Sequence, residues 1–237
     1  MSTQPASVLT FGAPPQPTAE IAGRSERFPI HRVYCVGRNY AAHIREMGLD
    51  PDREPPFFFM KPADSVVPSD TAVPYPPQTA DFHHEIELVI AIGAGGSDIP
   101  VEAALDHVFG YGVGMDLTRR DLQVDARNRG RPWESGKSFD HSAPLAPLHL
   151  AADVGPLSRG RIWLTVNGDI RQEGDIGQMI WSTAEVVSAA SRLWELRPGD
   201  LIYSGTPEGV GALAPGDLVE GGIDGLTGLT IRIGGAD

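Results

Sequence analysis

The sequence lacks several features that would mark a secreted, membrane-bound or nucleic-acid-binding protein. Its 237 residues include one cysteine, Cys35, which excludes an intramolecular disulfide and fits a reducing cytoplasm. No run of about 18 apolar residues is present, so no transmembrane helix is expected. The first twenty residues lack a basic segment and a long apolar core, so no secretory signal is predicted. A net charge of −12 argues against nucleic acid and anionic membranes as partners.

Glycine and proline are frequent, with 28 and 21 residues, and many stand in short turn signatures. This favours many short strands joined by tight loops over a helix bundle. The dipeptide Asn167-Gly168 between two alternating runs predicts a β-hairpin. The sequence therefore predicts one mainly β domain of the α+β class over residues 30–237, after a loosely ordered leader, 1–29. The segments with helical features are 38–48, 101–110, 118–130 and 183–196.

The segment HHEIELVIAIG carries two acids in a hydrophobic strand predicted from Glu85 to Ile92. In a strand, side chains alternate between faces, so Glu85 and Glu87 share one face while the isoleucines and Leu88 line the other. A wet edge strand is the ordinary alternative. If the carboxylates converge to about 4 Å, they repel by roughly 4 kcal/mol at an effective dielectric near 20. Such a pair requires a cation or a shared proton.

Asp116 follows the glycine-rich run YGVGM and offers a third oxygen ligand. Its ordinary alternative is a cap or turn residue. Three acids without histidine or cysteine at zinc spacing favour Mg²⁺ or Mn²⁺ over Zn²⁺. The sequence thus contains a candidate divalent-metal site.

His43 and Glu46 stand at i and i+3 of a predicted helix, a spacing that suits a water-activating pair. An exposed helix pair is the alternative. Arg120 and Gln123 follow Asp116 closely enough to point back towards a ligand that it holds.

Two further candidates stand beside glycines. Lys137 in GKSFD has room for a ligand, although a surface lysine is the usual interpretation. Thr206 in SGTPEGVG is a candidate anion donor, with a plain hairpin turn as the alternative. That loop is not a phosphate-binding P-loop, because the GK[ST] ending is missing.

Seven segments, in this order, resemble the fumarylacetoacetate hydrolase family, specifically its acylpyruvase and fumarylpyruvate hydrolase branch. The resemblance covers roughly residues 30–235. The segments are YCVGRNYAAHIREM, FFFMKPAD, HHEIELVIAIG, GMDLTRRDLQ, GKSFD, VNGDIRQEG and SGTPEGVG.

The resemblance implies a mixed β-roll with layered sheets, usually dimeric, and a role for each candidate residue. Glu85, Glu87 and Asp116 match metal ligands for Mg²⁺ or Mn²⁺, with Ca²⁺ as a crystallographic substitute. His43 and Glu46 match the water-activating dyad. The positions that hold or polarise the substrate are Lys137, Arg120, Gln123, Lys61 and Thr206.

The expected function is metal-dependent hydrolysis of the carbon–carbon bond of a 3-acylpyruvate. Fumarylpyruvate, cleaved to fumarate and pyruvate in gentisate-type aromatic catabolism, is the specific expectation. Its second carboxylate calls for a basic residue, with Arg38, Arg127 and Arg131 as candidates. The alternatives are an oxo-acid decarboxylase or isomerase, such as an oxaloacetate decarboxylase or a 2-hydroxyhepta-2,4-diene-1,7-dioate isomerase, and a noncatalytic module with a structural cation.

Overall fold

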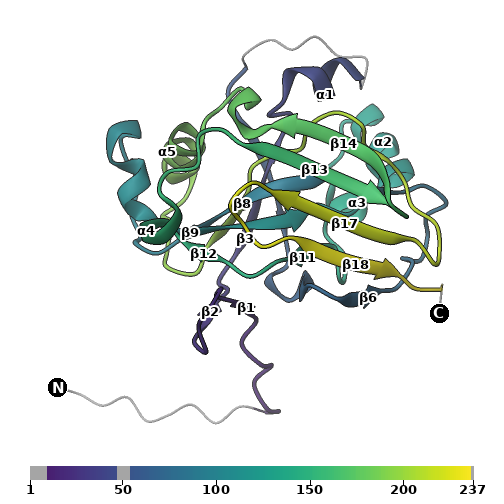
Figure 1. Ribbon diagram of the computed structural model, residues 1–237, viewed down its shortest axis with the longest axis horizontal. Coiled ribbons are helices and arrows are strands. Elements are labelled where there is room, and N and C mark those ends of the chain that lie inside the picture. The colour runs from purple at the N-terminus through teal and green to yellow at the C-terminus, as the bar shows by residue number, and fades with distance from the viewer. Residues whose placement is uncertain (1–9, 47–53, 236–237) are drawn as a thin grey trace.

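The computed structural model describes residues 10–46 and 54–235, and strands predominate in it (Figure 1). The largest sheet has the strand order β4-β3-β15-β8-β9-β11-β5, with β12 paired to β9. This mixed sheet confirms the prediction of a mainly β fold. Its strands are β3 (Val33–Gly37), β4 (Phe57–Lys61), β5 (Val66–Pro68), β8 (Ile86–Ile92), β9 (Val108–Met115), β11 (Ala143–Leu145), β12 (His149–Leu150) and β15 (Leu201–Tyr203).

A second sheet, in the order β14-β13-β17-β18-β6, packs across the first (Figure 1). The isoleucines and Leu88 of β8 share one buried cluster with Ile162, Leu164 and Val219 of the second sheet. The alternation predicted for this segment therefore holds, and its apolar face forms the core between the sheets. The strands of the second sheet are β6 (Thr71–Val73), β13 (Arg161–Val166), β14 (Asp169–Asp175), β17 (Leu218–Ile223) and β18 (Leu229–Ile233).

The hairpin at Asn167-Gly168 forms as predicted, and it joins β13 to β14. Both turn residues have positive φ, 54° and 87°, as a two-residue turn of this kind requires. A small sheet, β10-β7-β16, adjoins the large one, and a hairpin of β1 and β2 precedes the main body. Their bounds are β1 (Thr18–Glu20), β2 (Arg27–Pro29), β7 (Phe82–His84), β10 (Thr118–Arg119) and β16 (Gly211–Ala212).

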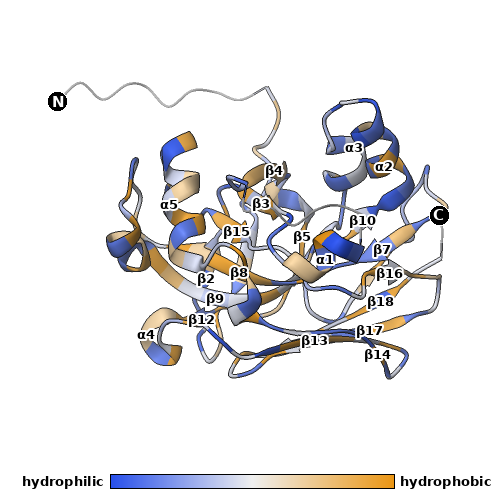
Figure 2. Cartoon of the chain, turned by 90° about the horizontal axis from the view of Figure 1, so that it is seen from above, coloured by the Kyte–Doolittle hydropathy of each residue, from blue (hydrophilic) through white to orange (hydrophobic). Residues whose placement is uncertain are grey.

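Three short helices, α1, α2 and α3, lie together on one side of the molecule (Figures 1 and 2). They surround the end of the large sheet at which β3 and β15 finish and β8 begins. In the described ranges, no helix is long and apolar enough to span a membrane. The α-helices are α1 (Ala41–Glu46), α2 (Arg120–Asn128), α3 (Glu134–Lys137), α4 (Ala151–Val154) and α5 (Thr183–Leu193), and the 3₁₀ helices are Ala63–Ser65, Val101–His107 and Ile176–Gln178.

Two elements differ from the sequence-based expectation. Residues 101–110 do not form one helix, because the chain makes a 3₁₀ helix only to His107 and enters β9 at Val108. Pairing with β8 begins there, so Gly110 lies inside a strand and does not end a helix. The strand predicted from Glu85 begins at Ile86, and Glu85 lies between β7 and β8. The predicted helix over 38–48 is seen as α1, and its last residues lie outside the described ranges.

Candidate active site

The three predicted acids converge at one end of the large sheet. Glu85 precedes β8, Glu87 is its second residue, and Asp116 directly follows β9. The backbone N–H of Asp116 donates to the carbonyl of Glu85 at 2.9 Å, which ties the two strand ends together. One oxygen from each carboxylate lies within 4.8 Å of the others, and all three side chains are buried.

Lysines hold two of these acids. The Lys137 ammonium donates to Glu85 Oε2 at 2.8 Å, to Asp116 Oδ2 at 2.6 Å and to the Thr118 hydroxyl at 2.7 Å. Lys61 Nζ forms an ion pair with Asp116 Oδ1 at 2.8 Å. The angles of this contact are not those of a hydrogen bond, so Oδ1 has no hydrogen-bond partner among the described residues. Both lysine side chains are buried.

These contacts determine the charge states of Glu85 and Lys137. Burial acts to raise the pKa of the Glu85 carboxyl, but Lys137 and Arg120 outweigh it and lower that pKa below its usual range. Arg120 also donates directly to Glu85 Oε1. Burial acts to lower the pKa of Lys137, and Asp116 and Glu85 reverse that effect and raise it. Glu85 is therefore ionised and Lys137 is charged.

Of the three acids, Glu87 has the negative charge that is least balanced by nearby cations. Burial, followed by the charges of Asp116 and Glu85, raises its pKa well above the usual range. In the described part of the chain its carboxylate pairs with no cation and accepts one hydrogen bond, from the N–H of Gly205 at 2.8 Å. Gly205 has φ +97°, and a Cβ there would lie 2.7 Å from Asn39 Cβ, so glycine is needed to aim this N–H.

The donor set fits a divalent cation. Three converging carboxylates supply the hard oxygen ligands that such ions prefer. Glu87, which pairs with no cation among the described residues, is the acid whose charge a divalent cation would balance most. The chain thus has a site able to bind a divalent metal.

Beside these acids, α1 brings His43 and Glu46 together. His43 Nδ1 and Glu46 Oε2 are 3.3 Å apart, and the imidazole is buried. Both carboxylate oxygens of Glu46 accept the N–H of Gly209 at 3.1 Å, which fixes the carboxylate from the opposite side. His43 lines the same pocket as the acids, so the dyad faces the candidate metal site.

Arg120 orients Gln123 one turn further along α2. Its Nη1 donates to Gln123 Oε1 at 2.5 Å, and the Gln123 amide nitrogen, which has no acceptor among the described residues, can donate into the pocket. Gly136 allows α3 to approach, since a Cβ there would lie 2.7 Å from the backbone nitrogen of Gln123. This close packing carries Lys137 to the acids.

Nine of the predicted residues line this one pocket, and Lys61 and Glu46 contact it through Asp116 and His43. Of the three arginines considered for a second carboxylate, Arg38 lines it, whereas Arg127 and Arg131 do not. The predicted lining residues are Arg38, His43, Glu85, Glu87, Asp116, Arg120, Gln123, Lys137 and Thr206.

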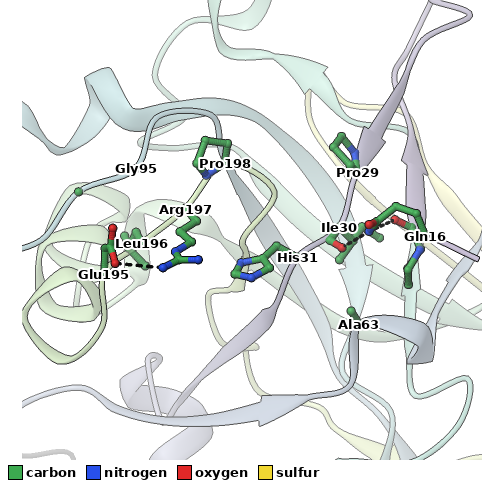
Figure 3. A pocket seen from close by; sticks show the side chains of 12 residues that line it. Gln16, Pro29, Ile30, His31, Ala63, Gly95, Glu195, Leu196, Arg197 and Pro198 are labelled. Carbon is green, nitrogen blue, oxygen red and sulfur yellow. Dashed lines mark hydrogen bonds and ion pairs between the residues drawn. The ribbon is translucent and has the colours of Figure 1, made fainter. Parts of the chain in front are cut away.

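A larger hollow, of about 800 Å³, lies at the opposite end of β3 and β15 (Figure 3). Its ionisable side chains have partners: His31 Nδ1 lies 2.8 Å from Asp200, and Arg197 lies 3.2 Å from Glu195. None of the predicted site residues lines it. The narrower pocket with the acids is therefore the candidate active site, despite the greater size of this hollow.

Sequence reasoning missed two buried amides that support the site. Asn39 donates to the carbonyls of Ser204 and Trp181 and accepts the Trp181 N–H, which anchors the start of the 204–209 loop. Gln172 of β14 bridges the same loop to the start of β8. Both stand in motifs quoted above, but their partners lie far away in sequence and no local pattern indicates them.

The fold and the buried acids define a class of metal-binding α+β enzyme, and comparison with known proteins identifies the family. The family model "Fumarylacetoacetate (FAA) hydrolase C-terminal" matches residues 32–234. The chain belongs to the fumarylacetoacetate hydrolase family. This confirms the resemblance seen in the sequence and the expected fold.

Relatives at high coverage carry the names of several enzymes. A crystal structure of fumarylpyruvate hydrolase from Pseudomonas aeruginosa in complex with Mn²⁺ and pyruvate is 56% identical, covers 96% of this chain and 99% of its own, and has a TM-score of 0.94. The fumarylpyruvate hydrolase of Ralstonia sp is 39% identical over 80% of this chain and 98% of its own. The mitochondrial oxaloacetate tautomerase FAHD1 of Rattus norvegicus is also 39% identical, over 85% of this chain and 90% of its own.

Proposed function

We propose that the protein is a divalent-metal-dependent hydrolase that cleaves fumarylpyruvate, a 3-acylpyruvate, into fumarate and pyruvate. The observation that carries this proposal is the presence, in one pocket, of the buried acids and of a histidine paired with a carboxylate. A relative at 56% identity was crystallised as a fumarylpyruvate hydrolase with Mn²⁺ and pyruvate. Mg²⁺ or Mn²⁺, held by Glu85, Glu87 and Asp116, is the proposed cofactor.

The bound cation supplies Lewis-acid polarisation and a fixed point of attachment for the oxo-acid end of the substrate. His43, held by Glu46, takes a proton from a water as its oxygen bonds to the distal carbonyl carbon. The amide nitrogen of Gln123 donates to the oxyanion that develops on that carbonyl. Lys137 stabilises the oxyanion through its charge, because its three N–H groups already donate to Glu85, Asp116 and Thr118. The carbon–carbon bond then breaks, fumarate leaves, and the electron pair passes to the pyruvate enolate, whose carbon takes up a proton.

The substrate's two ends require different partners. Thr206 and Arg120, which line the pocket, are proposed to hold the oxo-acid end near the acids. Lys61, which lies against Asp116 behind the lining, is proposed to polarise that end through its charge. Arg38 is proposed to bind the second carboxylate of the fumaryl group, because it is the one of the three candidate arginines that lines the pocket. A cytoplasmic homodimer acting in aromatic catabolism completes the proposal, and light scattering on the purified protein tests the dimer.

The test is pyruvate release from fumarylpyruvate with Mn²⁺ or Mg²⁺, measured with a pyruvate-consuming coupled assay. Activity should disappear with EDTA and return with added metal. Unchanged turnover after chelation, or no pyruvate release in any metal, would reject the proposal. The Glu87→Gln variant serves as the matched control for metal dependence.

A second candidate is tautomerisation or decarboxylation of oxaloacetate, favoured by the 39% identity to a rat oxaloacetate tautomerase. These reactions also pass through an enolate but need no attacking water. They are assayed directly with oxaloacetate, by the enol absorbance and by pyruvate formation. A kcat/KM higher for oxaloacetate than for fumarylpyruvate would make this the principal activity.

A further inference from the structure

Gln172 is a buried amide that joins the two large sheets beneath the pocket. It is the one fully buried side chain of β14, with 0% exposure, and it points into the molecule from an otherwise mainly exposed strand. Its Nε2 donates to the Thr206 hydroxyl oxygen at 2.8 Å and to the Pro207 carbonyl at 2.9 Å. Its Oε1 accepts the N–H of Ile86 at 3.1 Å and lies 3.0 Å from His84 Nδ1.

These four contacts fix the orientation of the amide. If its oxygen and nitrogen were exchanged, the amide N–H groups would face the Ile86 N–H, which is also a donor. The amide oxygen would then face the Pro207 carbonyl oxygen, which is also an acceptor. The Ile86 N–H can only donate, so the atom facing it is the oxygen. The atom facing Pro207 and Thr206 is therefore the nitrogen, and every hydrogen-bonding position of the amide is used.

This orientation determines the role of the Thr206 hydroxyl. Its oxygen already accepts a hydrogen from Gln172, so its own hydrogen must point elsewhere. Among the residues that the structure describes, no acceptor receives that hydrogen. Thr206 is 2% exposed and lines the pocket that contains the three acids. An acceptor on a bound ligand would satisfy it.

We propose that Gln172 is a positioning residue: it turns the Thr206 hydroxyl into a committed hydrogen-bond donor to a carboxylate oxygen of the bound oxo-acid. The inference rests on the proposed function, because it assigns the oxo-acid end of the substrate to this donor. Gln172 does not touch the ligand. It acts through Thr206, and it holds the 206–207 loop and the start of β8 in one arrangement.

The test is a double-mutant cycle read by ligand binding. Oxalate serves as the probe, since it presents a carboxylate beside a second oxygen and is not hydrolysed. Its dissociation constant is measured by calorimetry at saturating Mn²⁺ in wild type, Gln172→Glu, Thr206→Val and the double variant. Glutamate at 172 offers only acceptors when ionised, so the Thr206 hydrogen turns towards it. Thr206→Ser, which keeps the hydroxyl, is the matched control.

We expect Gln172→Glu and Thr206→Val each to weaken oxalate binding about tenfold, the lower end of what one hydrogen bond to a charged group contributes. The double variant should bind as Thr206→Val does, and Thr206→Ser within about twofold of wild type. Losses that multiply to about a hundredfold in the double variant would overturn the proposal, as would unchanged binding in Thr206→Val.

Folding is checked in each variant by its melting temperature. If Gln172→Glu does not fold, Gln172→Met replaces it in the cycle. Gln172→Met should weaken oxalate binding less, and it should have no effect on oxalate binding when Thr206 is already valine. Oxalate binding is measured without turnover, so the outcome is separable from the proposed reaction. A protein that binds oxalate as predicted but releases no pyruvate would reject fumarylpyruvate as substrate and leave the role of Gln172 intact.

Discussion

The Lys137 ammonium lies 2.6 Å from Asp116 Oδ2, and both side chains are almost completely buried. A charge in that position is costly unless it is paired, and Glu85 is the second partner of Lys137, at 2.8 Å. This lysine therefore contributes to the stability of the site as well as to the proposed stabilisation of an oxyanion.

Lys137→Met is expected to destabilise the protein strongly when no metal is present. Breaking a buried ion pair costs about 3–5 kcal/mol, which for a chain of this size lowers Tm by about 10 °C. Added Mn²⁺ should restore part of the loss, because a divalent cation neutralises the acids that the lysine leaves behind. The measurement is thermal unfolding in EDTA and in Mn²⁺. Arg129→Met, which breaks an exposed pair with Asp125, is the control and should change Tm by no more than about 2 °C.

Glu87→Gln should change metal-free stability in the opposite direction. Glu87 has no cationic partner among the described residues and is repelled by Asp116 and Glu85, so a neutral amide relieves repulsion. In EDTA we expect Tm to rise by about 2–4 °C, equivalent to about 1 kcal/mol. Glu85→Gln, which removes a partner of Lys137 and Arg120, should lower it. Both variants should bind Mn²⁺ at least about tenfold more weakly. A metal-free Glu87→Gln protein less stable than wild type would contradict this assignment of charge.

His43→Ala should abolish hydrolysis while leaving metal binding intact. Loss of a general base typically lowers the rate by about 10²–10⁴-fold. In the described part of the chain, His43 hydrogen-bonds to Glu46 and not to Glu85, Glu87 or Asp116. Decarboxylation of oxaloacetate, if the protein performs it, should fall less, because no water is activated. Rates with both substrates and a Mn²⁺ titration provide the comparison. An equal fall in the two rates would indicate that His43 serves binding or structure.

Short sequence patterns predicted those elements whose structure depends on residues close together in the sequence. The alternation around Leu88 and the Asn167-Gly168 turn correspond to β8 and to the β13–β14 hairpin. The 101–110 segment failed because its own helical tendency yields to pairing of β9 with β8 from Val108 onwards. Tertiary pairing of this kind leaves no trace in a ten-residue window.

Glu85 and Glu87 were identifiable as a pair because residues at i and i+2 of an extended segment share a face. The role of Gln172 was not, since its contact with Ile86 spans 86 residues and joins strands of different sheets. The same applies to Lys137, because the short segment ESGK gives no sign that this lysine would be buried among carboxylates. Long-range packing supplies this information, and one sequence does not.

Asp121 provides a pH-dependent test of how α2 is held in place. Burial acts to raise its pKa, but hydrogen bonds from the Thr79 hydroxyl and from the N–H groups of Ala80 and Leu122 outweigh it and lower that pKa. A carboxyl whose folded pKa is lowered stabilises the fold above its ordinary pKa of about 3.9. That contribution is lost as pH falls through the folded value.

Asp121→Asn should therefore lower Tm by about 2–4 °C at pH 7, and the difference from wild type should shrink as pH falls below the ordinary carboxyl pKa of about 3.9. The amide nitrogen of asparagine opposes the Ala80 N–H and cannot replace that contact. Thermal unfolding of both proteins between pH 3 and 7 provides the measurement. A difference that stays constant over this range would show that the charge of Asp121 is not responsible.

Arg38 is the residue expected to determine preference for a substrate with a second carboxylate. It lines the pocket, it has φ 61°, and its guanidinium carbon lies 5.6 Å from the centre of the Phe57 ring. Its Nε is buried and has no hydrogen-bond partner among the described residues, so the group is available to an anion. A non-glycine residue in this left-handed conformation is strained, which is common where a side chain serves binding.

Wild type should therefore prefer fumarylpyruvate to acetylpyruvate by about 10–100-fold in kcat/KM, since a hydrogen bond to a charged group contributes about 1.5–3 kcal/mol. Arg38→Met should reduce that ratio to within about threefold by lowering kcat/KM for fumarylpyruvate alone. Arg127→Met is the matched control, because Arg127 does not line the pocket, and it should keep the wild-type ratio. Steady-state kinetics with both substrates at saturating Mn²⁺ measure this ratio in each variant. If Arg38→Met loses activity equally on both substrates, Arg38 supports the pocket in general and the second carboxylate is recognised by another group.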